Sequence, residues 1–181
     1  LAAGALSMAN GLNSIAIGSN SYATGNDAFT AGFNSAATSD NALALGSSAI
    51  ASGTGSYAAG LEAEASGANS MALGTRSTST NTDSWAAGVN ARASGRNSTA
   101  LGSGSIATNT DAFAAGVQAK ALADNATSFG TGATASGVES QAVGYFANSQ
   151  SLRGVAVGPY ANVKGTDSMA LGHNASTTSN Q

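Results

Sequence analysis

The sequence predicts an all-β fold in which one chain winds into a parallel β-roll, a solenoid of 14-residue coils. Three observations predict it. A glycine recurs at every fourteenth position from position 4 without one insertion, small residues occupy fixed slots between these glycines, and large and small side chains alternate with a period of two. The array covers residues 1–181 without a linker, so we expect a single domain of about 13 coils.

The recurring glycine of each coil, here called the frame glycine, is predicted to be a structural turn residue after the first strand. Seven positions later comes a second turn former, which is often glycine and elsewhere Asn81 or Asn109. We expect asparagine in this second slot because it tolerates a positive φ. Counted from the second coil, the frame glycines are Gly18, Gly32, Gly46, Gly60, Gly74, Gly88, Gly102, Gly116, Gly130, Gly144, Gly158 and Gly172.

Each coil is predicted to hold two short strands, one before and one after the frame glycine. In the segment 13–18, Ile15 and Ile17 face one side and Ala16 faces the other. In the segment that follows, Ser21 and Ala23 share one side. The small sides of both strands are expected to line a narrow interior, since alanine far outnumbers Leu, Ile, Val and Phe combined.

The outer side of the first strand is apolar in most coils, and a single coil cannot bury it. A continuous apolar stripe marks an interface, and because this stripe runs the length of the array, we expect another copy of the chain to cover it. The predicted interface residues are Ile15, Ile17, Phe29, Leu43, Leu45, Tyr57, Met71, Leu73, Trp85, Leu101, Phe113, Phe129, Val143, Val155, Val157, Met169 and Leu171.

The turn before the first strand carries Asn or Asp in most coils. The two residue types interchange, and aspartates never occupy neighbouring coils in this slot, as in the series Asn13, Asp27 and Asn41. We interpret these residues as structural, with side chains that bond to the backbone of the turn.

The element Asn-Ser-x-Ala-x-Gly, followed by Ser or Ala and then by Ala, returns along the whole chain. It stands at residues 13–18, 69–74, 97–102 and, beginning with Asp, 167–172. This repeat resembles the head repeats of trimeric autotransporter adhesins, the YadA-like heads. The coils between Gly130 and Gly158 depart from the pattern, for example with Gly154 in place of Ser.

The resemblance implies a left-handed parallel β-roll and three chains side by side as a homotrimer. It also implies a place at the cell surface, at the tip of a fibre that projects from a Gram-negative outer membrane. Such heads adhere to host cells and to extracellular-matrix proteins. We expect this sequence to hold head repeats alone, without the neck, coiled-coil stalk or membrane anchor.

The residue types limit the chemistry. The chain has no cysteine and one histidine, His173, which excludes disulfides, thiolate zinc sites and multi-histidine metal sites. The scarcity of basic residues makes nucleic acid an unexpected partner, and no apolar run is long enough for direct membrane insertion. We expect no metal, no cofactor and no catalytic residue, and therefore no enzyme.

The candidate ligand-binding residues are the basic side chains of the middle coils, namely Arg76, Arg92, Arg96 and Lys120. They can contact acidic groups of a matrix protein, a glycan or a cell-surface receptor. The alternative is that they only keep the surface soluble and discourage sheet stacking.

Three functions remain open from the sequence. The first is an adhesin head that binds host cells or matrix components through a rigid trimeric β-roll. The second is a structural spacer segment of a surface fibre, and the third is a segment of a trimeric phage fibre.

Overall fold

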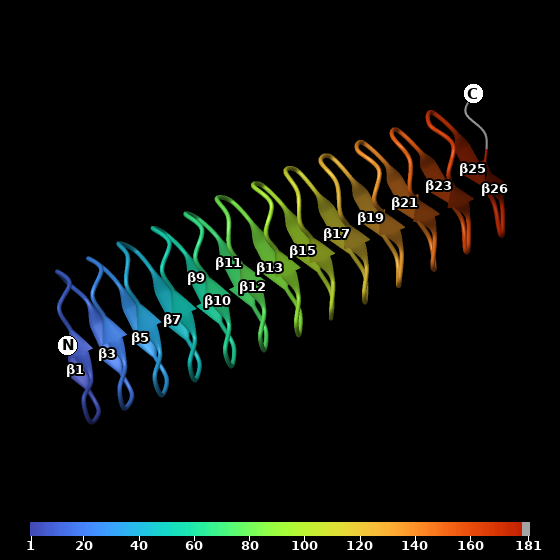
Figure 1. Cartoon of the computed structure of the whole chain (residues 1–181). Coiled ribbons are helices and arrows are strands. Elements are labelled where there is room, and N and C mark those ends of the chain that lie inside the picture. Colours follow the sequence, from blue (N-terminus) through green and yellow to red (C-terminus); the bar gives the residue numbers. More distant parts are fainter. Residues whose placement is uncertain (179–181) are drawn as a thin grey trace. The chain divides into compact units, whose positions relative to one another are not determined.

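The structure, a computed structural model, describes residues 1–178. The chain forms two compact units, Leu1–Asn90 and Ala91–Gln181. Both are built from the same coil, which holds two strands joined by a turn at each end (Figure 1). The fold is a parallel β-solenoid of about 13 turns of 14 residues and has no helix within residues 1–178, which confirms the predicted all-β roll.

The unit Leu1–Asn90 alternates its strands between two parallel sheets. The first strands of the coils form sheet A: β1(Ala2–Ala3), β3(Ile15–Ile17), β5(Phe29–Ala31), β7(Leu43–Leu45), β9(Tyr57–Ala59), β11(Met71–Leu73) and β13(Trp85–Ala87). The second strands form sheet B: β2(Met8–Ala9), β4(Tyr22–Ala23), β6(Ala36–Ala37), β8(Ile50–Ala51), β10(Glu64–Ala65) and β12(Thr78–Ser79).

The unit Ala91–Gln181 repeats this arrangement. Its part of sheet A contains β15(Thr99–Leu101), β17(Phe113–Ala115), β19(Thr127–Phe129), β21(Gln141–Val143), β23(Val155–Val157) and β25(Met169–Leu171). Its part of sheet B contains β14(Arg92–Ala93), β16(Ile106–Ala107), β18(Lys120–Ala121), β20(Thr134–Ala135), β22(Asn148–Ser149), β24(Asn162–Val163) and β26(Ser176–Thr177).

Strand pairing follows the sequence repeat without a slip. Each residue pairs with its equivalent in the next coil, as in Ala58↔Ala72 and Ala100↔Ala114. Every side chain therefore stacks on the corresponding side chain of its neighbour, at about the 4.8 Å spacing of hydrogen-bonded strands. Equivalent residues of successive coils thus form a continuous row of side chains along each unit.

Four slots of each coil face inward, and they hold small residues in every coil apart from Val163. They are the third, fifth, tenth and twelfth positions after the frame glycine; in one coil they are Ser21, Ala23, Ala28 and Thr30, which are buried. This confirms the predicted narrow core. Serine suits the slots at turns because its hydroxyl donates to the carbonyl three positions back, as in Ser77 Oγ to Gly74 O at 2.8 Å.

The frame glycines are required by both backbone angle and space. Gly60 has a φ of 141°, and a Cβ placed there would lie 2.5 Å from the carbonyl oxygen of Gly74 in the next coil. A side chain at this slot would strain its own backbone and would collide with a neighbouring backbone that cannot move aside.

The preference for glycine in the second slot, seven positions after the frame glycine, has a different cause from the one predicted. Gly53 and Gly67 do not have a positive φ, but a Cβ on Gly67 would lie 2.0 Å from the carbonyl oxygen of Asn81. Asn81 and Asn109 are also absent from the positive-φ residues. The prediction that asparagine stands there for its positive φ was therefore wrong. Close approach of the coils explains the glycines of this slot, whereas Asn81 and Asn109 carry a side chain there without a positive φ.

The positive φ of the second turn occurs two residues later, in the Asn/Asp slot. Asn13, Asp27 and Asn69 have φ values of 56°, 54° and 53°, and Asn and Asp tolerate this left-handed conformation best after glycine. Their side chains bond to each other along the stack, as in Asn13 Nδ2 to Asp27 Oδ1 at 3.0 Å. The structural interpretation holds, but the bonds predicted to backbone were assigned to the wrong slot.

The bonds from side chain to backbone occur one residue earlier. Asp40 Oδ1 accepts the amide of Asn26 at 2.8 Å, and Asp124 Oδ1 accepts that of Thr110 at 3.1 Å. Each carboxylate thereby ties its own coil to the coil before it.

The departures near Gly154 compensate for one another. Val163 is the largest side chain that is fully buried, and it occupies a slot that holds alanine in most coils. A Cβ on Gly154 would lie 2.9 Å from Val163 Cγ1. The missing side chain at residue 154 therefore gives room to the extra methyl groups at residue 163.

Candidate functional site

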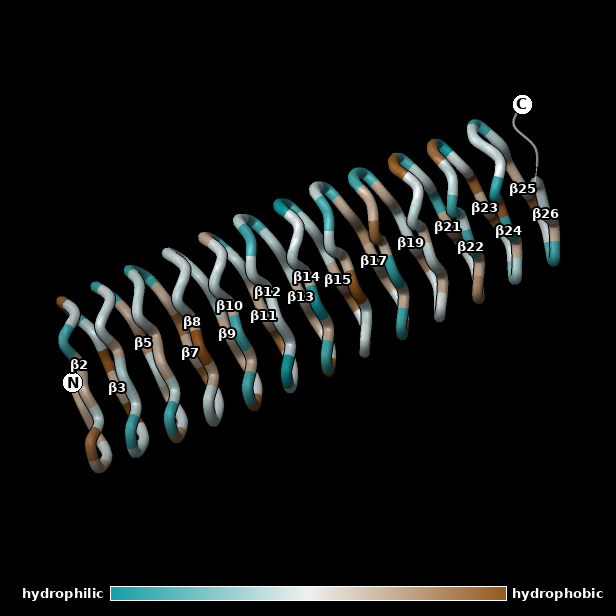
Figure 2. The backbone as a smooth tube through the Cα atoms, viewed as in Figure 1, coloured by the Kyte–Doolittle hydropathy of each residue, from teal (hydrophilic) through white to brown (hydrophobic). Residues whose placement is uncertain are grey.

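The outer face of sheet A carries the predicted interface residues, and none of them is buried in the single chain. Ile17 and Trp85 are each 42% exposed, and Phe129 is 56% exposed. Figure 2 shows the hydrophobic segments along β3 and β7 in the unit Leu1–Asn90. In each unit the row presents large apolar side chains to its surroundings, as a protein–protein interface requires.

Large and small residues alternate along this outer face. Leu45 stacks between Ala31 and Ala59, and Leu73 pairs with Ala87. In the slot directly before the frame glycine, alanine thus separates larger apolar residues in every second coil from Ile17 to Phe129, and from Phe129 to Leu171 every residue in this slot is larger than alanine. Such a surface can interdigitate with a second copy of itself.

A second exposed apolar row lies in the turn from sheet A to sheet B, directly after alternate frame glycines, and the sequence predictions do not include it. The sequence does contain a pattern that marks this row: from Phe33 to Tyr145, the position directly after the frame glycine is apolar in every second coil and Ser or Thr in the coils between. The row consists of Phe33, Leu61 and Val89 in the first unit and Val117 and Tyr145 in the second, all 45–62% exposed.

An exposed aromatic cluster extends this row in the unit Ala91–Gln181. The rings of Phe146 and Tyr160 stack with centroids 6.1 Å apart, and Tyr145 contacts both edge-on at 4.6 and 5.4 Å. His173 lies edge-on to Tyr160 at 6.1 Å. Partial desolvation, with a smaller contribution from Tyr145, raises the pKa of Tyr160 above its ordinary value.

The four basic candidates do not form one cluster. Arg76 binds Glu62 across neighbouring coils, with Nε and Oε2 3.0 Å apart. Arg92 and Lys120 lie in the outer row of sheet B, where each pairs with Ile106 between them. Arg96 lies in the turn at the other end of the coil. Within the second unit, therefore, only Arg92 and Lys120 share a surface.

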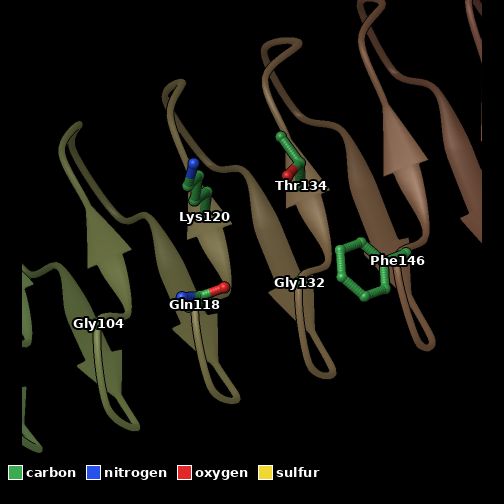
Figure 3. A pocket seen from close by; sticks show the side chains of 6 residues that line it. All are labelled: Gly104, Gln118, Lys120, Gly132, Thr134 and Phe146. Atoms are coloured by element: carbon green, nitrogen blue, oxygen red, sulfur yellow. The ribbon is translucent and has the colours of Figure 1, made fainter.

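A depression of about 450 Å³ opens beside Lys120, where sheet B meets the turn from sheet A. Its lining residues all belong to the second unit: Gly104, Gln118, Lys120, Gly132, Thr134 and Phe146 (Figure 3). Lys120 is the one predicted ligand-binding residue in this lining. No group of three or more His, Cys, Asp or Glu residues within residues 1–178 is arranged to hold a metal ion.

The family comparison accounts for the repeat. The model of the YadA head domain repeat matches residues 2–29, 51–77, 79–105, 107–133, 135–161 and 164–181, which is most of the chain. The chain belongs to the YadA head family. The coils between the first two matched ranges keep the same frame, since β5 pairs with β7 in the same register as the other strands.

YadA-like heads in general form homotrimers, and YadA-family domains are found on the bacterial surface as trimeric autotransporters. No curated protein matches this chain. Within this YadA head, the core slots are nearly uniform and the outer slots vary. The variable outer slots therefore give the coils surfaces of different chemistry on one constant core.

Proposed function

We propose that the chain is the ligand-binding head of a trimeric adhesin and has no catalytic activity. Three copies associate through the outer face of sheet A. The surface that stays exposed binds components of host cells or of the extracellular matrix, and the head projects from a Gram-negative outer membrane.

One observation carries the proposal: the apolar outer row of sheet A continues through every coil of both units, yet none of its predicted interface residues is buried in the single chain. Burial of large apolar side chains contributes about 25 cal/mol per Å² removed from water, so a row of this length favours association strongly. A trimer also presents every surface site three times, and weak contacts then add up to firm attachment.

The oligomeric state gives the first test, with an exposure-matched pair of variants. Ile17 in sheet A and Ile50 in sheet B are both isoleucines, and both are 42% exposed. By light scattering coupled to size exclusion, we expect a mass near three times 17.3 kDa for the wild type and for Ile50→Asp. Ile17→Asp places a charge in the interface and is expected to weaken the trimer, so that it dissociates at a higher protein concentration than Ile50→Asp does. Equal dissociation of the two variants over a dilution series would contradict an interface at Ile17.

Adhesion gives the second test. The wild-type trimer, coupled to beads, is expected to bind host cells or immobilised matrix proteins, whereas beads coupled to an unrelated trimeric protein do not. A fibre in which other repeats of equal length replace this segment separates a binding head from a spacer. Undiminished adhesion by that fibre would contradict the proposal.

A further inference from the structure

The depression beside Lys120 exists because two side chains are missing from one row. The residue two positions after each frame glycine has a positive φ in every described coil, and this row is here called the first-turn row. In the second unit it contains glycine at residues 104 and 132, on either side of Gln118. Figure 3 shows Gly132 between Gln118 and Phe146, with no side chain to fill the space.

The lining combines a cation, hydrogen-bonding groups and an aromatic wall. Lys120 and Thr134 project from paired positions on β18 and β20, and Gln118 lies in the turn before β18. The ring of Phe146 leans over Gly132, where a Cβ would lie 2.7 Å from Cε1. Pockets that bind small polar ligands typically combine an apolar wall with a few converging polar groups.

Lys120 has no acid to neutralise it. It forms no ion pair with any residue in the described part of the chain, where the two ion pairs are those of Arg76 and Arg153. The acidic residues of the second unit all lie in the turns at the opposite end of the coil: Asp111, Asp124, Glu139 and Asp167. Lys120 therefore brings an unneutralised positive charge to the lining of the depression, at the end of a side chain that points along β18 away from Gln118 (Figure 3).

Phe146 is held in a conformation that its residue type disfavours. Its φ is 50°, and the same row carries asparagine at residues 20, 34 and 90. A bulky residue keeps such a backbone conformation only when its surroundings enforce it. Stacking on Tyr160 and edge contact with Tyr145 fix the ring at the end of the depression.

We propose that this depression binds a carboxylate-bearing sugar residue of a glycan. The carboxylate pairs with Lys120, the hydroxyl groups bond to Gln118 and Thr134, and the C–H face of the sugar ring packs on Phe146. A volume of about 450 Å³ accommodates one monosaccharide unit. The inference rests on the proposed function, since it names the ligand class of an adhesin head.

Two sources can supply such a sugar, a terminal sialic acid or a uronic acid within a chain. The probes are therefore sialyllactose and an unsulfated hyaluronan tetrasaccharide, with lactose as the neutral reference. We expect the wild-type trimer to bind at least one acidic probe about tenfold more tightly than lactose in isothermal titration calorimetry. The probe that binds identifies the source.

Two variants use residues that the same rows already carry elsewhere in the chain. Lys120→Glu introduces at residue 120 the residue type that the outer row of sheet B already carries at residue 64. This variant is expected to weaken the binding of acidic probes about tenfold. Gly104→Asn fills the depression and should weaken binding as well, and its Cβ would make an ordinary contact of 3.5 Å with Gln118 Cγ. Lys164→Gln, which removes an exposed charge outside the lining, is the control and should bind like the wild type.

The outcomes separate the site from the function. Acidic probes that bind no better than lactose, or a folded Lys120→Glu trimer that binds them like the wild type, would overturn the site. Adhesion to cells or matrix would then still support the proposed function. Binding of an acidic probe without any adhesion would support the site and contradict adhesion as the function.

Discussion

The two units share one backbone and one core but differ on the surface. Leu1–Asn90 contains one basic and five acidic residues, a net charge of −4, and Ala91–Gln181 contains five basic and four acidic residues, a net charge of +1. The difference is sharpest in matching slots, because Glu62 and Glu64 of the first unit correspond to Gln118 and Lys120 of the second.

The contrast between the two units shows which slots of the coil are free to change. Inward slots hold small residues, except where Gly154 makes room for Val163, and the frame glycines are fixed by close approach of the coils. Outer slots meet no such limit, and each contributes one side chain per coil to its row. A solenoid can therefore change its surface chemistry coil by coil while its core stays constant.

The largest expected effect on stability comes from substituting the frame glycines, which both units share. Gly60 and Gly116 have φ values of 141° and 136°, and a Cβ on either lies 2.5 Å from a carbonyl oxygen. Gly60→Ala and Gly116→Ala are each expected to destabilise the fold by about 3–5 kcal/mol, combining backbone strain with overpacking. Thermal unfolding followed by circular dichroism measures both.

Gly172→Ala is the control for that experiment. Gly172 has a φ of 114°, but a Cβ there meets no atom within 4 Å. It retains the strain without the collision, so its effect should be clearly smaller. Unequal losses of stability in Gly60→Ala and Gly116→Ala would show that close approach does not constrain the frame glycines equally in the two units.

The next effect concerns a core site where the second unit departs from the common pattern. Gly154→Ser restores the usual residue but places its Cβ 2.9 Å from Val163 Cγ1, and we expect a loss of about 1–3 kcal/mol. Val163→Ala alone leaves a cavity and also destabilises. In the double variant the contact with Val163 is removed but the Cβ still lies 2.6 Å from Ser149 Oγ and 2.8 Å from Ser151 Oγ, so the loss should be smaller than the sum of the single losses, which a double-mutant cycle of unfolding free energies measures. Additive losses would disprove the compensation.

A graft tests whether the surface difference accounts for glycan binding. Residue 78 of the first unit is already threonine, as is residue 134, so five changes transfer the proposed lining: Ser48→Gly, Glu62→Gln, Glu64→Lys, Arg76→Gly and Asn90→Phe. We expect the graft to add a second, weaker acidic-sugar site in calorimetry, because Gly104 and Val89 stand where Tyr160 and Tyr145 hold the ring of Phe146. The partial graft without the two glycine changes should gain no site, because residues 48 and 76 would still fill the space.

The regular parts of this molecule could be predicted from the sequence, and the irregular ones could not. Ala16 and Gly60 repeat because of steric limits, and such limits appear directly as invariant residue types. Asn81 was misinterpreted because glycine serves both close approach and positive φ, and composition does not separate the two causes. The depression was missed because Gly132 matters only once its equivalents in the adjacent coils are known to lie beside it.

The smallest expected effect compares one ion pair from each unit. Arg153 donates from Nε and Nη2 to both carboxylate oxygens of Asp167, with Nη2 and Oδ2 2.8 Å apart, whereas Arg76 bonds to Glu62 through Nε alone. The hydrogen bonds from Arg153 lower the pKa of Asp167 below its ordinary value of 3.8. A carboxylate with a lowered pKa stabilises the fold above that ordinary value, and this contribution disappears as the pH falls through the lowered pKa.

Asp167→Asn keeps a residue that tolerates the φ of 56° at this position and removes only the charge. The variant should therefore unfold at a slightly lower temperature than the wild type near neutral pH, and the gap should close in strong acid. Glu62→Gln should shift the midpoint less, because the single contact between two exposed side chains contributes little. A gap for Asp167→Asn that stays constant down to strong acid would mean that the lost interaction is not the ion pair.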